Sequence, residues 1–121
     1  MAMTKRYQVT EDRYDLEVML QVDHDLLTPE RATEINSFWT DADERLDAAD
    51  GDVVRAVILM AARRFMFGIL EDTWAGVRGM QQDFDEAEGW GGSAWNGITL
   101  IEFDGAPQIE LEDMALEEVE G

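Results

Sequence analysis

Residues 15–22 read Asp15-Leu16-Glu17-Val18-Met19-Leu20-Gln21-Val22, and this stretch decides the fold class. Apolar side chains occupy every second position, as in a strand that turns one face toward a core and the other toward water. The residues that share the apolar face are Leu16, Val18, Leu20 and Val22. The stretch therefore predicts a half-buried strand, and the rest of the chain must supply an apolar layer to cover it.

Further strands are expected on both sides of this one along the chain. Residues 7–10 predict a preceding strand, and residues 11–13 predict the tight connection between the two. Residues 98–103 form a third clear strand signal. Asp104-Gly105 is typical of a hairpin turn, so residues 108–112 are expected to pair back as a final strand.

A long first helix is predicted after the central strand. Thr28-Pro29 is typical of a helix start, because threonine caps free amides and proline lacks the N–H that would be unbonded there. Apolar residues then recur at steps of three and four as far as Ala49, and Gly51 follows as a plausible left-handed terminating residue. The first helix is therefore expected to run without interruption from Thr28 to the end of the 40s.

Two more helices complete the predicted layout. Asp52 is a natural cap for a largely apolar helix from Val53 to about Glu71, and a third helix is predicted from about Thr73 to Glu88. The expected fold class is α+β, with about three helices packed on one face of a small antiparallel sheet. Residues 1–121 are expected to form one domain, in which residues 113–121 are an acidic tail or a short helix.

The charge of the chain is its most unusual property. Its 28 acidic residues against 9 basic ones give a net charge of -19, and residues 83–121 contain no basic residue at all. Such a surface repels nucleic acids and anionic membranes and attracts basic protein surfaces. Direct nucleic-acid binding and membrane insertion are therefore not expected, whereas a basic partner protein is. A halophilic or GC-rich genome would explain the same composition without any partner.

Several kinds of chemistry have no support in the sequence. The chain has no cysteine, so it has neither disulfides nor thiolate ligands, and its first residues lack the apolar region of a signal peptide, which favours a cytoplasmic location. His24 is the only histidine and lies between two aspartates, a pattern typical of a solvated turn. The carboxylates at 83–88 do not match a calcium-binding loop. No metal site, no cofactor and no catalytic residue are predicted, and the chain is not expected to be an enzyme.

Two surfaces are candidates for binding a partner. Carboxylates three or four residues apart on a helix stand about 5–6 Å apart and can imitate a row of phosphates. The acidic candidates on the first and third helices are Glu30, Glu34, Asp41, Glu44, Asp47, Asp83, Glu86 and Glu88. The second candidate is the glycine-rich loop that carries Trp90 and Trp95, because tryptophans are frequent interface anchors. The alternatives are a merely solvated acidic face and two tryptophans that fold back as a lid.

Residues 22–39, which include the Leu-Thr-Pro-Glu helix start and the Phe-Trp pair that follows, and residues 51–57 carry a family resemblance. Over about residues 15–70 the chain resembles an uncharacterised domain family of phage, prophage and mobile-element proteins of Gram-negative bacteria. The resemblance implies a biological context and transfers no functional residue. In that context, small acidic proteins include anti-CRISPR and anti-restriction inhibitors.

These observations lead to two hypotheses of different classes. In the first, the chain is a non-enzymatic phage or mobile-element protein that inhibits a basic, nucleic-acid-binding host protein through charge mimicry. In the second, it is a self-assembling structural module, a homodimer that buries the apolar second helix or the tryptophan loop between copies. The salt dependence of partner binding and the size of the particle in solution distinguish the two.

Overall fold

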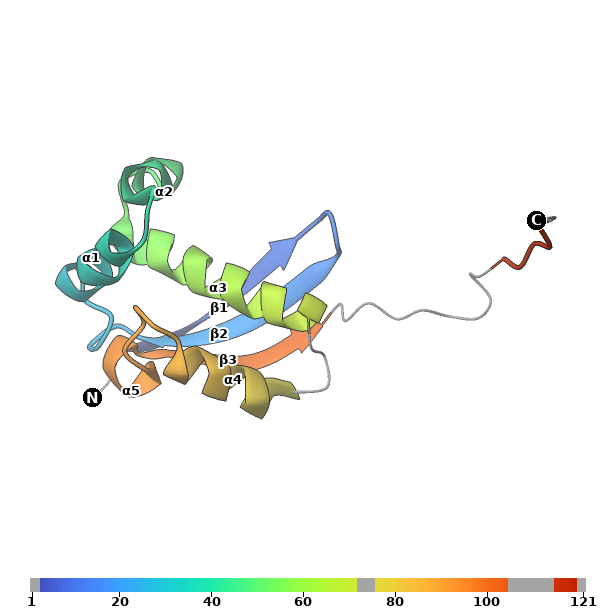
Figure 1. The fold of residues 1–121 in the computed structure, drawn as a ribbon. Helices are drawn as coiled ribbons and strands as arrows, with labels where there is room; N and C mark the ends of the chain where they lie inside the picture. The colour runs from blue at the N-terminus through green and yellow to red at the C-terminus, as the bar shows by residue number, and fades with distance from the viewer. Residues whose placement is uncertain (1–2, 72–75, 105–114, 120–121) are drawn as a thin grey trace.

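A computed structural model of the chain describes residues 3–71, 76–104 and 115–119 (Figure 1). The described elements follow in the order β1 Thr4–Glu11, β2 Leu16–Asp23, α1 Pro29–Phe38, α2 Ala42–Ala48, α3 Val53–Glu71, α4 Gly76–Glu86, α5 Ser93–Asn96 and β3 Ile98–Asp104. The α+β class with a three-stranded antiparallel sheet is confirmed. The described residues contain five helices, however, where about three were predicted.

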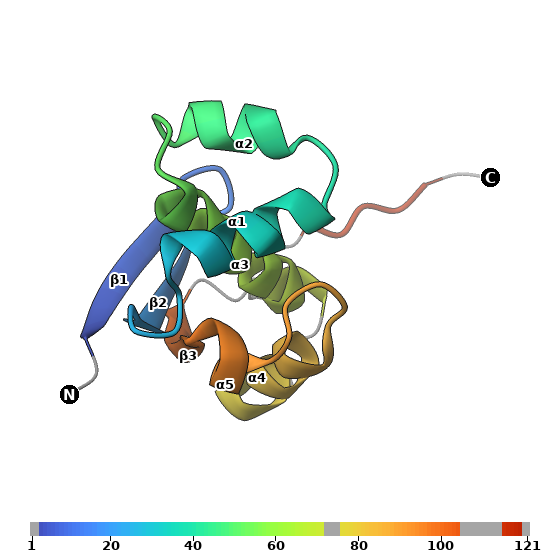
Figure 2. The same cartoon turned by 90° about the vertical axis from the view of Figure 1, so that its left-hand side faces the viewer.

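The strand at residues 15–22 lies in the middle of the sheet, as β2. The strand order is β1-β2-β3 and both pairings are antiparallel. Along β2 buried residues alternate with half-buried ones, which confirms the predicted period of two. Between Met19 and Leu20 the register with β3 shifts, because Glu102 and Leu100 are their partners and Ile101 is an extra residue. Figures 1 and 2 show the helices gathered on one face of this sheet.

Helix α3 supplies the layer that covers the sheet. Val57, Ala61, Phe65 and Ile69 recur every fourth residue and are all at most 2% exposed. They pack in one core with the inward side chains of β2 and β3. The bounds of α3 are those predicted, and its cap is confirmed, because Asp52 Oδ1 accepts a hydrogen bond from the Arg55 N–H at 3.1 Å. Its opposite side is not covered within the described residues.

The prediction of one continuous first helix is wrong in its middle, because this region forms two helices, α1 and α2. Its start is confirmed, since Thr28 Oγ1 accepts from the Arg31 N–H at 3.2 Å. The chain leaves the helix at Trp39, which has extended dihedral angles, and Asp41 then adopts a left-handed conformation with φ 65°. Helix α2 begins at Ala42 and ends before Gly51, whose φ of 81° confirms the predicted left-handed termination. The acidic residues of this region therefore lie on two helices and their connection.

Helix α4 covers the edge of the sheet formed by β3. The Gln81 side chain accepts a hydrogen bond from the Leu100 N–H at 2.6 Å and donates one to the Ile98 carbonyl at 3.4 Å. These are backbone groups that an edge strand would leave unpaired, so the glutamine stands in for a neighbouring strand. The predicted third helix is confirmed over residues 76–86, whereas Glu88 lies in the turn beyond its end. The predicted start at Thr73 falls outside the described residues.

Two other predictions concern the C-terminal part of the chain. The final strand at residues 108–112 lies outside the described residues. Residues 115–119 have no helix or strand, and Leu116 and Val119 are 103% and 83% exposed. Across the described ranges, no helix combines the length and the apolar character that crossing a membrane requires.

Candidate functional site: an acidic surface on α1 and α2

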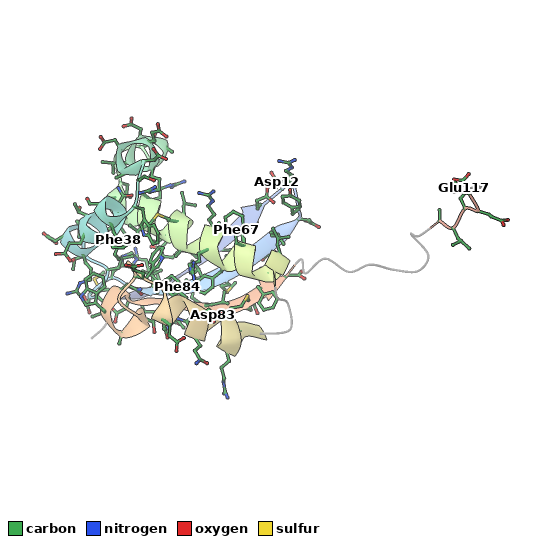
Figure 3. All side chains as sticks on the ribbon, viewed as in Figure 1. Asp12, Phe38, Phe67, Asp83, Phe84 and Glu117 are labelled. Carbon is green, nitrogen blue, oxygen red and sulfur yellow. The ribbon has the colours of Figure 1, made fainter. Side chains whose placement is uncertain are left out.

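The predicted acidic residues of the first helical region are all exposed. We refer to Glu30, Glu34, Asp41, Glu44 and Asp47 together as the α1–α2 acidic surface. Figure 3 shows oxygen-tipped side chains pointing outward around α2. Glu30 and Glu34 lie one turn apart on α1, and Glu44 and Asp47 lie three residues apart on α2, so each pair presents two carboxylates on one side of its helix. The structure thus presents a surface of carboxylates to solvent.

A polar network around Arg45 fixes the angle between the two helices. The Arg45 guanidinium donates hydrogen bonds to Asn36 Oδ1 at 2.8 Å and to the carbonyls of Asn36 at 2.9 Å, Trp39 at 3.3 Å and Thr40 at 2.5 Å. Asn36, which is 5% exposed, donates in turn to the Ala42 carbonyl at 3.1 Å. These bonds satisfy carbonyl groups at the end of α1 that have no partner within the helix. Arg45 therefore has a structural role, and within the described residues it donates no hydrogen bond to a carboxylate.

The acidic residues predicted on the third helix are also exposed, but their surroundings differ. Asp83, Glu86 and Glu88 reach solvent. Asp83 lines a hollow of about 650 Å³ to which Asp41 also contributes, so the two groups of acids approach each other there. The same hollow is lined by Arg63 and Arg64 of α3. The two groups of acids therefore meet in a region of mixed charge that includes Asp41, and the members of the α1–α2 acidic surface that lie outside this region are Glu30, Glu34, Glu44 and Asp47.

Neither tryptophan of the aromatic loop is fully exposed. Trp90 is 2% exposed and lies 4.8 Å from the Phe84 ring centroid, inside the core. Trp95 is half-buried beneath the Arg31 guanidinium, which lies 4.8 Å from its ring and donates to its carbonyl at 2.9 Å. Burial of Trp90 is incompatible with a role as an exposed anchor. The arrangement matches the alternative in which both tryptophans fold back onto the protein.

The glycines of this loop make the fold-back possible. A Cβ atom on Gly91 would lie 2.5 Å from Trp95 Cε3, and one on Gly89 would lie 2.5 Å from Phe38 Cδ1. The loop thus packs against both its own tryptophan and the end of α1. Buried Asn96 holds its other end, donating to the Trp90 carbonyl at 2.9 Å and accepting from the Ile98 N–H at 2.8 Å. The glycines that favoured an interface loop instead allow close packing.

The remaining chemical candidates have structural partners. His24 Nε2 lies 2.7 Å from the Tyr7 hydroxyl, a contact that links the residue after β2 to the middle of β1. Asp85 accepts hydrogen bonds from the Gln81 side chain and from the Ser93 N–H, so its role is structural. Within the residues that the structure describes, no three histidine or carboxylate side chains come together as metal ligands would.

A second surface lies on the exposed side of α3, the helix that the homodimer hypothesis expects to be buried between copies. The exposed side of α3 carries Leu59, Phe67 and Leu70, and together with the β1–β2 hairpin it lines a groove of about 400 Å³. The sequence pattern that could have indicated this surface is the four-residue spacing of Arg55, Leu59, Arg63 and Phe67. This spacing places alternating cationic and apolar side chains along one side of the helix. The sequence could not show that the hairpin would form the other wall.

Comparisons with known proteins agree with the resemblance and extend it. The model of the family described as "Protein of unknown function (DUF2528)" matches residues 17–117, well beyond the first 70 residues. Among curated proteins, the "Lambda prophage-derived protein ea10" of Escherichia coli O6:H1 (strain CFT073) and "Protein ea10" of Escherichia phage lambda are each 29% identical to the chain over 123 residues. Each match covers 96% of this chain and 98% of the relative. No solved structure matches.

Proposed function

The chain belongs to the DUF2528 family, whose matched relatives come from a phage and a prophage, and from that premise we propose that it is a non-enzymatic inhibitor of a basic host protein. The α1–α2 acidic surface binds the nucleic-acid-binding face of that protein and excludes its nucleic acid. The observation that carries the proposal is that no ion pair to these exposed carboxylates occurs among the described residues, since Arg45 donates its hydrogen bonds to Asn36 Oδ1 and to backbone carbonyls.

Charge repulsion makes such a surface costly to keep without a partner. Like charges three or four residues apart on a helix destabilise it by about 0.2–0.5 kcal/mol per pair. Helix α2 nevertheless carries Asp43, Glu44 and Asp47, although it has no fully buried side chain to compensate. A basic partner would relieve this repulsion, and the released energy would contribute to binding.

The spacing of the carboxylates suits a protein that normally holds nucleic acid. The basic side chains of such a protein are arranged to neutralise phosphates, which follow one another at about 1.7 Å along the axis of a duplex when both strands are counted. Carboxylates about 5–6 Å apart on a helix offer a row of acceptors on one face, although more widely spaced than the phosphates. The partner would therefore exchange one set of anions for another.

The proposal is tested by capture on the immobilised protein from Escherichia coli lysate, with elution along a salt gradient. The acidic variant Glu34→Gln/Glu44→Gln/Asp47→Asn is compared with the control Asp12→Asn/Asp15→Asn/Glu102→Gln. Both triple variants have the same net charge, and all six side chains are exposed, so only the position of the lost charge differs.

The expected result is a nucleic-acid-binding protein that elutes at moderate salt from the wild type and from the control. The acidic variant should bind it about tenfold more weakly, because three exposed charge pairs are lost. Equal retention of that protein by both variants would show that the α1–α2 acidic surface is not the binding site. Binding that does not change with salt would argue against charge complementarity.

A further inference from the structure

The groove between α3 and the β1–β2 hairpin is apolar, exposed and lined with cations. Its exposed apolar residues are Tyr14, Leu59, Phe67 and Leu70, which are 53%, 42%, 49% and 39% exposed. Figure 3 shows Phe67 on α3 and Asp12 near the hairpin tip on the same side of the molecule. Four large apolar side chains around one groove form a patch that soluble proteins usually cover. We call it the hairpin groove.

Two arginines give the hairpin groove a charge opposite to that of the rest of the protein. Arg63 lies over the Phe67 ring at 5.2 Å, and Arg13 lies over the Tyr14 ring at 5.4 Å. The groove also contains Glu11, but its carboxylate accepts the N–H groups of Arg13 at 3.0 Å and Tyr14 at 2.8 Å and is thereby tied to the hairpin turn. The groove therefore suits a ligand that combines apolar side chains with carboxylates.

The C-terminal segment of this chain has that chemistry. Leu116 and Val119 are three residues apart and almost fully exposed, so in one helical turn they would share a face. Glu117 and Glu118 lie between them and would face elsewhere, and Asp113 and Glu120 flank the segment. In the structure Leu116 and Val119 contact no apolar surface. An acidic segment with two unburied aliphatic residues and a cationic apolar groove are complementary.

The topology places the start of this segment close to the hairpin groove. Strand β3 ends at Asp104, which is paired with Glu17 of β2, and the adjacent Leu16 lines the groove. The twelve residues from Asp104 to Leu116 can span at most about 40 Å when extended. The segment is therefore long enough to reach the groove of its own chain, and the short tether favours that encounter over one with another molecule.

We propose that residues 115–119 dock in the hairpin groove of the same chain, with Leu116 and Val119 against Phe67 and Leu59 and the glutamates beside Arg13 and Arg63. Ordering these five residues costs a large part of the free energy gained on docking, so the docked and free states exchange. The ionic part of the contact weakens as salt screens it. Docking covers the apolar stripe of α3 and leaves the α1–α2 acidic surface free, so the inference does not depend on the proposed function.

The absence of cysteine makes disulfide trapping a direct test in the full-length chain. Leu59→Cys/Leu116→Cys places one thiol in the groove and one on the segment. The control Gln82→Cys/Leu116→Cys places the first thiol on the exposed side of α4 instead. With oxidised glutathione as oxidant and dilute protein, the intramolecular disulfide is followed by mass spectrometry.

The groove pair should close about tenfold faster than the control pair at low salt, because docking raises the effective concentration of the two thiols. Its advantage should fall in about 1 M salt, where the Debye length is about 3 Å. Adding Arg13→Gln/Arg63→Gln to the groove pair should remove most of the advantage while circular dichroism stays unchanged. Equal rates for the two pairs would overturn the proposal. Disulfide-linked dimers as the main product would overturn it too, because the groove would then be occupied by a second copy.

Discussion

Arg45 should be the residue on which the position of α2 depends most strongly, and Arg45→Met tests this. Methionine keeps the apolar stem of the side chain but removes the four hydrogen bonds to Asn36, Trp39 and Thr40. Helix α2 is only seven residues long and has no fully buried side chain, so neither helix propensity nor core packing can hold it in place. The loss of unfolding free energy in Arg45→Met should therefore be large for a residue that is only half-buried.

The magnitude follows from the number of bonds and the burial of their acceptors. Hydrogen bonds contribute about 1 kcal/mol each in net terms, so four lost bonds give about 4 kcal/mol. The half-buried site lets water replace some of them at Thr40, while Asn36, at 5% exposed, is left with an unsatisfied side-chain oxygen. The expected loss of unfolding free energy is about 3 kcal/mol.

Urea unfolding measures this loss, and Arg55→Met is the matched control. It removes the same charge from an exposed position of α3, and a surface change of this kind alters stability by no more than about 0.5 kcal/mol. Hydrogen exchange of the α2 amides should also speed up in Arg45→Met alone. If both the free energy and the exchange of α2 match those of the control, the Arg45 network does not hold α2 and the reasoning fails.

Three further predictions concern the backbone and the charge. Gly97→Ala should lower the free energy of unfolding, measured in urea, by several kcal/mol, because Gly97 has a φ of 78° and a Cβ there would lie 2.7 Å from the Asp23 carbonyl oxygen. Gly51→Ala should lower it by only about 1–2 kcal/mol, because φ is 81° but no atom lies near the added Cβ, so only the cost of the left-handed conformation remains. Asp47→Asn should raise the unfolding temperature slightly, because it removes repulsion from Glu44 and an unfavourable charge at the end of α2. Added salt should stabilise the wild type, which circular dichroism should still show folded at low salt; unfolding there would favour a halophilic explanation of the charge.

The parts of the fold that the sequence predicts are those governed by local periodicity and capping. Leu16 to Val22 alternate because the helices cover one side of the sheet only, and the structure shows the same alternation in burial. The bounds of α3 are predictable because Asp52 caps its first turn and its apolar residues recur at helical spacing. Each of these signals lies within a few residues of the element that it specifies.

The features that the sequence does not predict depend on contacts between distant residues. The break between α1 and α2 rests on Arg45 and Asn36, nine residues apart, whose side chains replace backbone hydrogen bonds without disturbing the apolar period. The acidic residues could be chosen correctly as exposed, but their division between two helices could not. Trp90 is predicted as a candidate interface anchor because the sequence does not show that the loop folds back and packs Trp90 against Phe84. The hairpin groove likewise requires two elements to come together.

The most direct test of the proposed function is a competition between the chain and nucleic acid for the host protein captured from lysate. Labelled nucleic acid bound to that protein is titrated with the wild type, the acidic variant and the control variant. We expect the wild type and the control to displace the nucleic acid, and the acidic variant to require about ten times more protein. A ternary complex in which the nucleic acid remains bound, or equal displacement by all three, would contradict inhibition through the α1–α2 acidic surface.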